Sequence, residues 1–113
     1  MKKYCLALDL VDDAELIREY ENFHKAENER KPITESIRSA GITNFEIFRT
    51  GNRLFTIMET TDDFDPARKA EMDAANPHVQ EWEALMWKYQ KPLPWAAPGE
   101  KWVLMEKIYE LPK

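Results

Sequence analysis

The sequence has little of the residues that several common protein classes require. Cys5 is its only cysteine, which excludes an internal disulfide and a structural zinc cluster of the cysteine and histidine type. Three glycines are too few for a phosphate-binding loop, and no Gly-x-Gly-x-x-Gly or Walker-type motif is present. No apolar run approaches the roughly 18 residues that a membrane span requires. The 16 Lys and Arg residues stand against 21 Asp and Glu, a net charge of −5, so a basic nucleic-acid-binding surface is not expected.

What the sequence does contain is enough apolar material for one packed core. Hydrophobic residues make up 43% of the 113 residues and aromatic residues 12%, so wholesale disorder is not expected. A chain of this length has the usual size of one domain, and we expect residues 1–113 to form it. The first residues run directly into a strand-like pattern rather than a secretory signal, so a cytoplasmic location is expected.

Strand-like alternation of apolar residues occurs in four places. In the first, Tyr4, Leu6 and Leu8 share one parity, which is typical of a β-strand. The predicted strands cover residues 4–10, 43–50, 53–60 and 102–111. A short link centred on Gly51 joins the second strand to the third, which predicts a β-hairpin with antiparallel strands.

Helical spacing fills the gaps between these strands. Leu16, Tyr20 and His24 recur every four residues behind a capping aspartate, Asp12 or Asp13, which predicts a helix with these three side chains on one face. The other predicted helices begin at Pro32, span residues 64–75 and follow Asn76-Pro77. The charged stretch 25–31 is predicted to be a solvated helix extension or a loop, and residues 91–100 an irregular connector.

The order strand, helices, two strands, helices, strand predicts a ferredoxin-like α+β fold. In this fold, helices cover one face of a four-stranded antiparallel sheet. The second, third and fourth strands carry apolar residues on both parities, for example Phe45 and Ile47 against Phe48. A sheet that is apolar on both faces needs a second cover, and we therefore predict a two-fold homodimer whose sheets face one another.

Two side chains of the first helix are candidates for acid–base chemistry. Tyr20 and His24 are four residues apart, so their side chains are neighbours, and both can give and take a proton. On spacing alone, a partly buried His24 that hydrogen-bonds a loop carbonyl is the more common situation. His78, the other histidine, is predicted to be exposed in the first turn of a later helix.

Trp82 is a candidate for sugar binding because it lies among Gln80, Glu81 and Glu83. An indole can stack on the C–H face of a pyranose while polar neighbours bind the hydroxyl groups. Carboxylates within predicted strands either face solvent, the commoner case, or line a cavity. They are Asp9, Glu46, Glu59 and Glu106.

An ordered set of short segments along the chain carries a family resemblance. The segments are Glu19-Tyr20 with His24, Gly41 to Phe48, Asn52 to Phe55 with Met58-Glu59, Asn76-Pro77 with Trp82 and Met86, and Met105 to Tyr109. Taken in this order, they resemble the L-rhamnose mutarotase family of small cytoplasmic enzymes that interconvert sugar anomers. The resemblance covers nearly the whole chain.

The resemblance implies a dimeric α/β barrel and an isomerase that acts on a monosaccharide by acid–base catalysis, without a metal or another cofactor. It implies that His24 is the proton donor and later the base, and that Tyr20 orients it or serves the second oxygen. Trp82 is then expected in the sugar pocket, with Trp87 one turn further on as a second substrate-binding residue. The substrate is expected to be a 6-deoxy-hexose, L-fucose or L-rhamnose, and the region from Trp82 to Pro94 is more similar to the L-fucose branch.

Two segments depart from the family pattern. Trp82-Glu83 stands where the family often has two adjacent tryptophans, and Lys31-Pro32-Ile33 replaces a Trp-Pro-Glu segment that follows the histidine. Two other interpretations therefore stay open. One is a dimeric α/β-barrel monooxygenase or haem-handling enzyme, since a fold does not determine a function. The other is a sugar-binding relative without catalytic activity.

Overall fold

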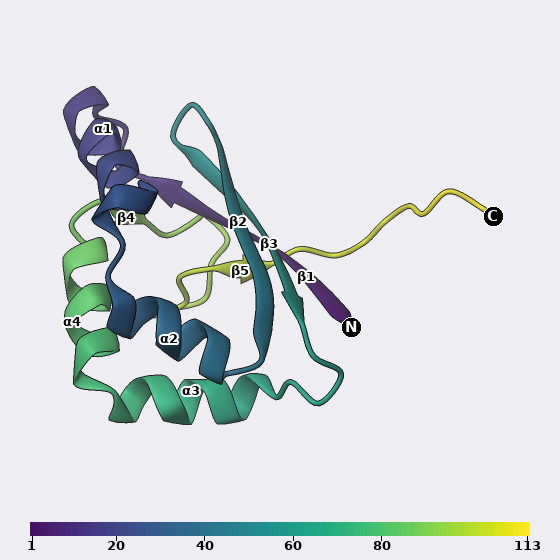
Figure 1. Ribbon diagram of the computed structural model, residues 1–113. Helices are drawn as coiled ribbons and strands as arrows, with labels where there is room; N and C mark the ends of the chain where they lie inside the picture. Colours follow the sequence, from purple (N-terminus) through teal and green to yellow (C-terminus); the bar gives the residue numbers. More distant parts are fainter.

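The computed structural model describes all 113 residues, from Met1 to Lys113. Its elements, in chain order, are β1 (Lys2–Leu10), α1 (Ala14–Phe23), the short 3-10 helix η1 (Ala26–Asn28), α2 (Lys31–Ser39), β2 (Ile42–Thr50), β3 (Arg53–Thr60), α3 (Pro66–Ala75), α4 (Pro77–Met86), β4 (Gln90–Lys91) and β5 (Val103–Leu104). The predicted α+β order of strands and helices is confirmed, and the helices lie on one side of a curled antiparallel sheet (Figure 1). None of the helices combines the length and the apolar sequence needed to cross a membrane.

The helix starts follow from local side-chain chemistry. Asp13 caps α1, because its carboxylate accepts hydrogen bonds from the backbone N–H groups of Glu15 and Leu16, each 3.0 Å long. Asn76 caps α4 in the same way, and Pro77 occupies the first helical position. Both caps agree with the sequence prediction. The charged stretch 25–31 contains η1 and joins α1 to α2.

The sheet is built around the two longest strand pairs. The strand order is β2-β3-β1-β4, and β5 also pairs with β1. Thr50 pairs with Arg53 at the end of the predicted hairpin, and the turn is closed by Gly51 at φ 56°, a left-handed conformation that favours glycine. β4 and β5 each have two residues and lie along the same edge of β1.

The core is divided into two clusters rather than one. The larger cluster joins β1, α1, β3 and α4 through Leu10, Tyr20, Leu54, Met86 and Tyr89. The smaller cluster contains Ala40, Ile42 and Phe64, near the start of β2. The sheet residues between the clusters face a cavity under the helices instead of packed side chains. This division of the core creates the space for a ligand.

The last predicted strand, residues 102–111, is wrong in its extent. Only Val103 and Leu104 pair with β1, and residues 106–113 form an extended C-terminal arm that leaves the body of the molecule (Figure 1). Continuing the antiparallel register would place Lys107 opposite Lys3, which is electrostatically unfavourable. It would also run past the beginning of β1 a residue or two later. The sheet accordingly has five strands, two of them very short, instead of four long ones.

The face of the sheet turned away from the helices carries an apolar row. Phe48 pairs with Phe55, Phe55 pairs with Ala7, and Ala7 pairs with Val103, so four apolar residues cross the sheet from edge to edge. The rings of Phe48 and Phe55 are in contact, with centroids 6.1 Å apart. We call this side of the sheet, with its apolar row, the outer face. None of the helices of the chain covers it (Figure 1).

Candidate active site

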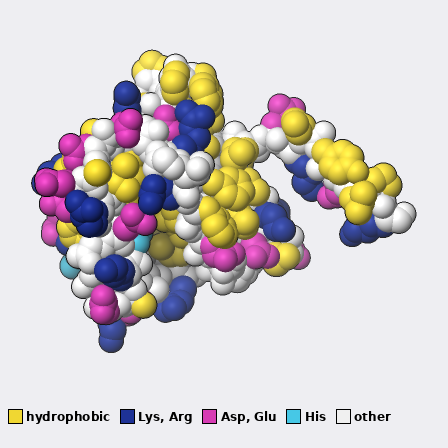
Figure 2. Space-filling view, turned by 90° about the horizontal axis from the view of Figure 1, so that it is seen from above, with side chains coloured by type: hydrophobic (Ala, Val, Ile, Leu, Met, Phe, Trp, Pro, Cys, Tyr) yellow, Lys and Arg dark blue, Asp and Glu magenta, His cyan; other side chains and the backbone are white.

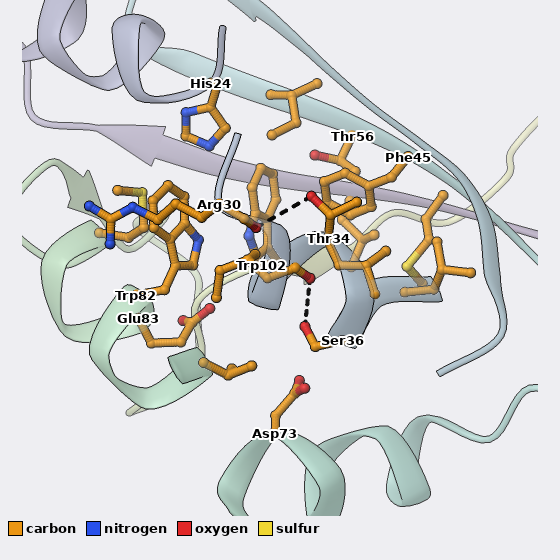
Figure 3. A pocket seen from close by; sticks show the side chains of 18 of the residues that line it. His24, Arg30, Thr34, Ser36, Phe45, Thr56, Asp73, Trp82, Glu83 and Trp102 are labelled. Carbon is orange, nitrogen blue, oxygen red and sulfur yellow. Dashed lines mark hydrogen bonds between the residues drawn. The ribbon is translucent and has the colours of Figure 1, made fainter. Parts of the chain in front are cut away.

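A cavity of about 870 Å³ lies between the helices and the concave face of the sheet. Its walls come from α1, the segment around η1, α2, the strands β1, β2 and β3, and α4, and most of the lining side chains are hydrophobic (Figure 3). At its far end, Lys69 and Asp73 of α3 form an ion pair with each other. Such a cavity, mainly apolar with a few polar groups, is typical of a site for a small molecule.

Tyr20 and His24 lie together at one end of this cavity. Tyr20 is buried in α1, and His24 is the C-terminal capping residue of the same helix, with the two ring centroids 4.3 Å apart. His24 Nδ1 is 2.7 Å from the backbone oxygen of Tyr20. Because a carbonyl oxygen only accepts, Nδ1 carries the hydrogen and donates it. A neutral His24 ring therefore has its lone pair on Nε2, ready to accept a proton.

The protonation states of this pair are set by their surroundings. Burial lowers the pKa of His24 below its usual 6.5, and the hydrogen bond to the Tyr20 carbonyl only partly offsets this effect. Burial also raises the pKa of Tyr20 to about 12; a hydrogen bond from Gln90 acts against the rise, and the charge of Glu83 adds to it. At neutral pH, His24 is thus largely a neutral base and Tyr20 a neutral phenol.

Trp82, on α4, forms the adjoining wall. The edge-to-face contact of its ring with His24 has a centroid distance of 5.6 Å, and Phe23 meets the same ring at 86°. Arg30, between η1 and α2, places its guanidinium 5.0 Å from the Trp82 ring centroid and 5.7 Å from that of Phe23. Arg30 therefore covers one face of the indole, and both side chains line the cavity (Figure 3).

An ion pair adjoins Trp82 at the next residue of α4. The Glu83 carboxylate lines the cavity and binds the ammonium group of Lys101. Trp87, which is at the end of α4 and 42% exposed, does not line the cavity. Its ring packs under the Lys101 ammonium at 4.9 Å, so it contacts the site only through the ion pair. Of the four predicted site residues, the structure brings Tyr20, His24 and Trp82 together and leaves Trp87 outside.

The strand carboxylates lie away from the cavity. Asp9 is buried against the Arg53 guanidinium on the outer face, with the nearest atoms 2.7 Å apart. Glu46 and Glu59 accept hydrogen bonds from the Asn44 amide on the same face, and Glu106 belongs to the exposed arm. The polar groups of the cavity wall therefore come mainly from the helices and the segments that flank them. No group of three or more His, Cys, Asp or Glu side chains is arranged to hold a metal ion.

Several residues of the site were not identified from the sequence. Gln90 Nε2 donates to the Tyr20 hydroxyl over 3.4 Å, although 70 residues separate them in the chain. Gln90 Oε1 and Thr56 Oγ1 are buried in the cavity wall without a hydrogen-bond partner in the protein. The sequence does not indicate Arg30 and Lys101 either, because only the fold brings them to Trp82 and Glu83. The one sequence feature that could have indicated this part of the site is Glu83 itself, a charged residue beside an apolar position of the helix.

Comparison with known proteins identifies the family. The sequence profile of the L-rhamnose mutarotase family matches residues 3–111. An L-fucose mutarotase from Xanthomonas campestris pv. campestris is 48% identical over 98% of this chain and 89% of its own length. A UPF0734 protein from Dictyostelium discoideum is 40% identical over 97% of this chain and 90% of its own length.

Two solved structures share the fold at low sequence identity. The L-rhamnose mutarotase of Formosa agariphila superimposes with a TM-score of 0.70 at 15% identity, over 99% of this chain and the whole of the other. Tetracenomycin F2 cyclase from Streptomyces glaucescens superimposes with a TM-score of 0.58 at 16% identity, over the same shares of the two chains. The fold alone therefore accommodates more than one chemistry. The sequence matches distinguish between them, and they show that the chain belongs to the L-rhamnose mutarotase family.

Proposed function

We propose that this chain interconverts the α and β anomers of L-fucose, with His24 moving the proton between the sugar oxygens. Membership of the family makes the chain a sugar isomerase of the mutarotase type. The preference for L-fucose rests on the relative that is 48% identical, which is an L-fucose mutarotase. The observation that carries the mechanism is the cluster of Tyr20, His24 and Trp82 around one end of the cavity.

Ring opening transfers one proton from the anomeric oxygen to the ring oxygen. Neutral His24 takes the anomeric proton at Nε2, the bond between C1 and the ring oxygen breaks, and the electron pair left on the ring oxygen accepts the proton from the imidazolium. The C1–C2 bond of the open aldehyde then rotates. Closure on the other face reverses both proton transfers and returns His24 to its neutral form. The Tyr20 carbonyl holds the ring orientation throughout, because it binds Nδ1.

The rate should depend on pH through His24. The base form of a group with a lowered pKa is already dominant below 6.5, so enzyme-catalysed exchange should rise from acid pH and level off before neutrality. Tyr20 should add no fall of the rate up to about pH 11, because its phenol stays protonated. The measurement is the anomer exchange rate from pH 4 to pH 10, corrected for the buffer reaction. A midpoint above 7 would contradict the assignment of His24 as the base.

The substrate is tested by magnetisation transfer in NMR. Irradiation of one anomeric proton of equilibrated L-fucose should reduce the signal of the other anomer only when the protein is present, with L-rhamnose as the comparison sugar. We expect faster exchange for L-fucose. Binding of the sugar without any exchange would identify a non-catalytic sugar-binding relative instead, and exchange with no 6-deoxy-hexose, ribose or galactose would remove the mutarotase proposal.

We further propose that one domain, residues 1–113, carries this activity as a cytoplasmic homodimer. The outer face supports the dimer, because Phe48, with half of its surface exposed, and Phe55 form an uncovered apolar row. The C-terminal arm supports it as well. Its Ile108, Tyr109 and Leu111 are at least 70% exposed, and Figure 2 shows apolar side chains standing clear of the body. A single cysteine accords with a reducing compartment.

A further inference from the structure

We propose that Glu83 binds the sugar hydroxyl groups at the end of the pyranose ring opposite the anomeric carbon, and that Lys101 holds the Glu83 carboxylate in position. This inference rests on the mutarotase function proposed above and adds the residue that reads the sugar. Glu83 is the acidic side chain of the cavity wall that follows Trp82 directly. In Figure 3 its carboxylate lies beneath the Trp82 ring, whereas His24 lies above that ring.

One carboxylate oxygen of Glu83 is committed to the protein and the other is not. Oε2 binds the Lys101 ammonium, while Oε1 makes no hydrogen bond within the chain. The Glu83 side chain lines the cavity and is 45% exposed, so it is accessible to a ligand. A carboxylate is a strong acceptor for hydroxyl donors, and its charge-assisted bonds are roughly twice as strong as neutral ones.

Lys101 is fixed by two contacts and can therefore hold Glu83 in one geometry. Its side chain is only 12% exposed, and its Nζ lies 4.9 Å from the centroid of the Trp87 ring. Trp87 thus supports the ion pair from outside the cavity. A positioned acceptor loses little conformational freedom when it binds a ligand, which favours affinity. Lys101 is accordingly a positioning residue.

The arrangement around Trp82 determines which hydroxyls reach Glu83. Arg30 covers one face of the indole, so the sugar stacks on the other face. Its anomeric carbon must lie at the His24 end, where the proton is moved. C1 and C4 are at opposite ends of a pyranose ring, so the hydroxyl on C4 extends toward Glu83.

The experiment combines side-chain and hydroxyl removal. Glu83→Gln keeps the size of the side chain and removes its charge, and exchange kinetics are measured with L-fucose, 4-deoxy-L-fucose and 2-deoxy-L-fucose. We expect the variant to raise KM about fivefold to tenfold for L-fucose and 2-deoxy-L-fucose, with kcat within about threefold, because the lost bond is charge-assisted. For 4-deoxy-L-fucose, the same substitution should change KM less than twofold. Glu81→Gln, on the exposed side of the same helix, is the matched control.

The outcomes separate this inference from its alternatives. The ratio of kcat/KM between two sugars does not depend on the folded fraction, so a destabilised variant still gives an answer. Lys101→Arg should keep the KM of the unmodified protein, and Lys101→Met should raise it about as much as Glu83→Gln does. An equal loss on all three sugars, or a fall in kcat at constant KM, would overturn the hydroxyl-binding role. Failure of the proposed function would be seen differently, as an absence of exchange in the unmodified protein.

Discussion

Replacement of His24 by alanine should reduce enzyme-catalysed anomer exchange by about 10²-fold or more, because a positioned acid or base typically contributes 10²–10⁴-fold. In the proposed mechanism His24 is the only group that carries the proton in both directions. Its substitution should leave the fold intact, since the residue ends α1 and borders the open cavity instead of filling the core. The measurement is magnetisation transfer on L-fucose, normalised to folded protein determined by circular dichroism.

Two further variants isolate the effect of the imidazole. Tyr20→Phe removes only the hydroxyl, which accepts a 3.4 Å hydrogen bond from Gln90, and keeps the backbone carbonyl that orients His24. We therefore expect a smaller loss of rate. His78→Ala changes an exposed residue in the first turn of α4, outside the cavity, and should leave exchange unaltered. A folded His24→Ala protein with full activity would refute the assignment, and Tyr20 and Glu83 would then be the proton carriers to test.

The sequence pattern was sufficient for the parts of the fold that depend on neighbouring residues. The caps at Asp13 and Asn76 and the hairpin at Gly51 are local features, and each can be predicted from a few neighbouring residues. The extent of the last strand cannot be predicted in this way. Alternation from Trp102 to Leu111 indicates an extended chain but does not say which strand will pair with it. In this structure β1 accepts only two of those residues.

The candidate site shows the same division between local and distant information. The spacing of Tyr20 and His24 on one helix predicts their proximity, and the structure places their rings 4.3 Å apart. The contact of Lys101 with Glu83 spans 18 residues and depends on how residues 91–100 return to the sheet. Trp87 follows Trp82 by five residues, which is about 140° past a full helical turn, so it contacts Lys101 outside the cavity. Burial and charge partners of this kind are properties of the fold and not of the motif.

The outer face and the C-terminal arm carry apolar surface that a single chain leaves exposed to water. The row from Phe48 to Val103 and the neighbouring pair Cys5 and Ile57 form the apolar centre of this face. Polar pairs lie beyond them, with Asp9 and Arg53 on one side and Lys3 and Glu59 on the other. An apolar centre within a polar rim is typical of a specific interface. In a two-fold arrangement the row meets the same row of the second protomer, so Phe48 and Phe55 would be buried in both protomers.

Replacement of Phe48 by glutamate should therefore convert a homodimer into a monomer. The substitution would place two like charges in the apolar contact, and burial of unpaired charges is strongly unfavourable. Sedimentation equilibrium at micromolar concentration should give about twice 13.4 kDa for the unmodified protein and 13.4 kDa for the variant. Phe48→Leu is the matched control and should remain dimeric, because it keeps an apolar side chain. Removal of residues 106–113 should also weaken the dimer if the arm crosses to the partner. A monomeric unmodified protein, or a Phe48→Glu variant that stays dimeric, would contradict an interface formed by the outer face.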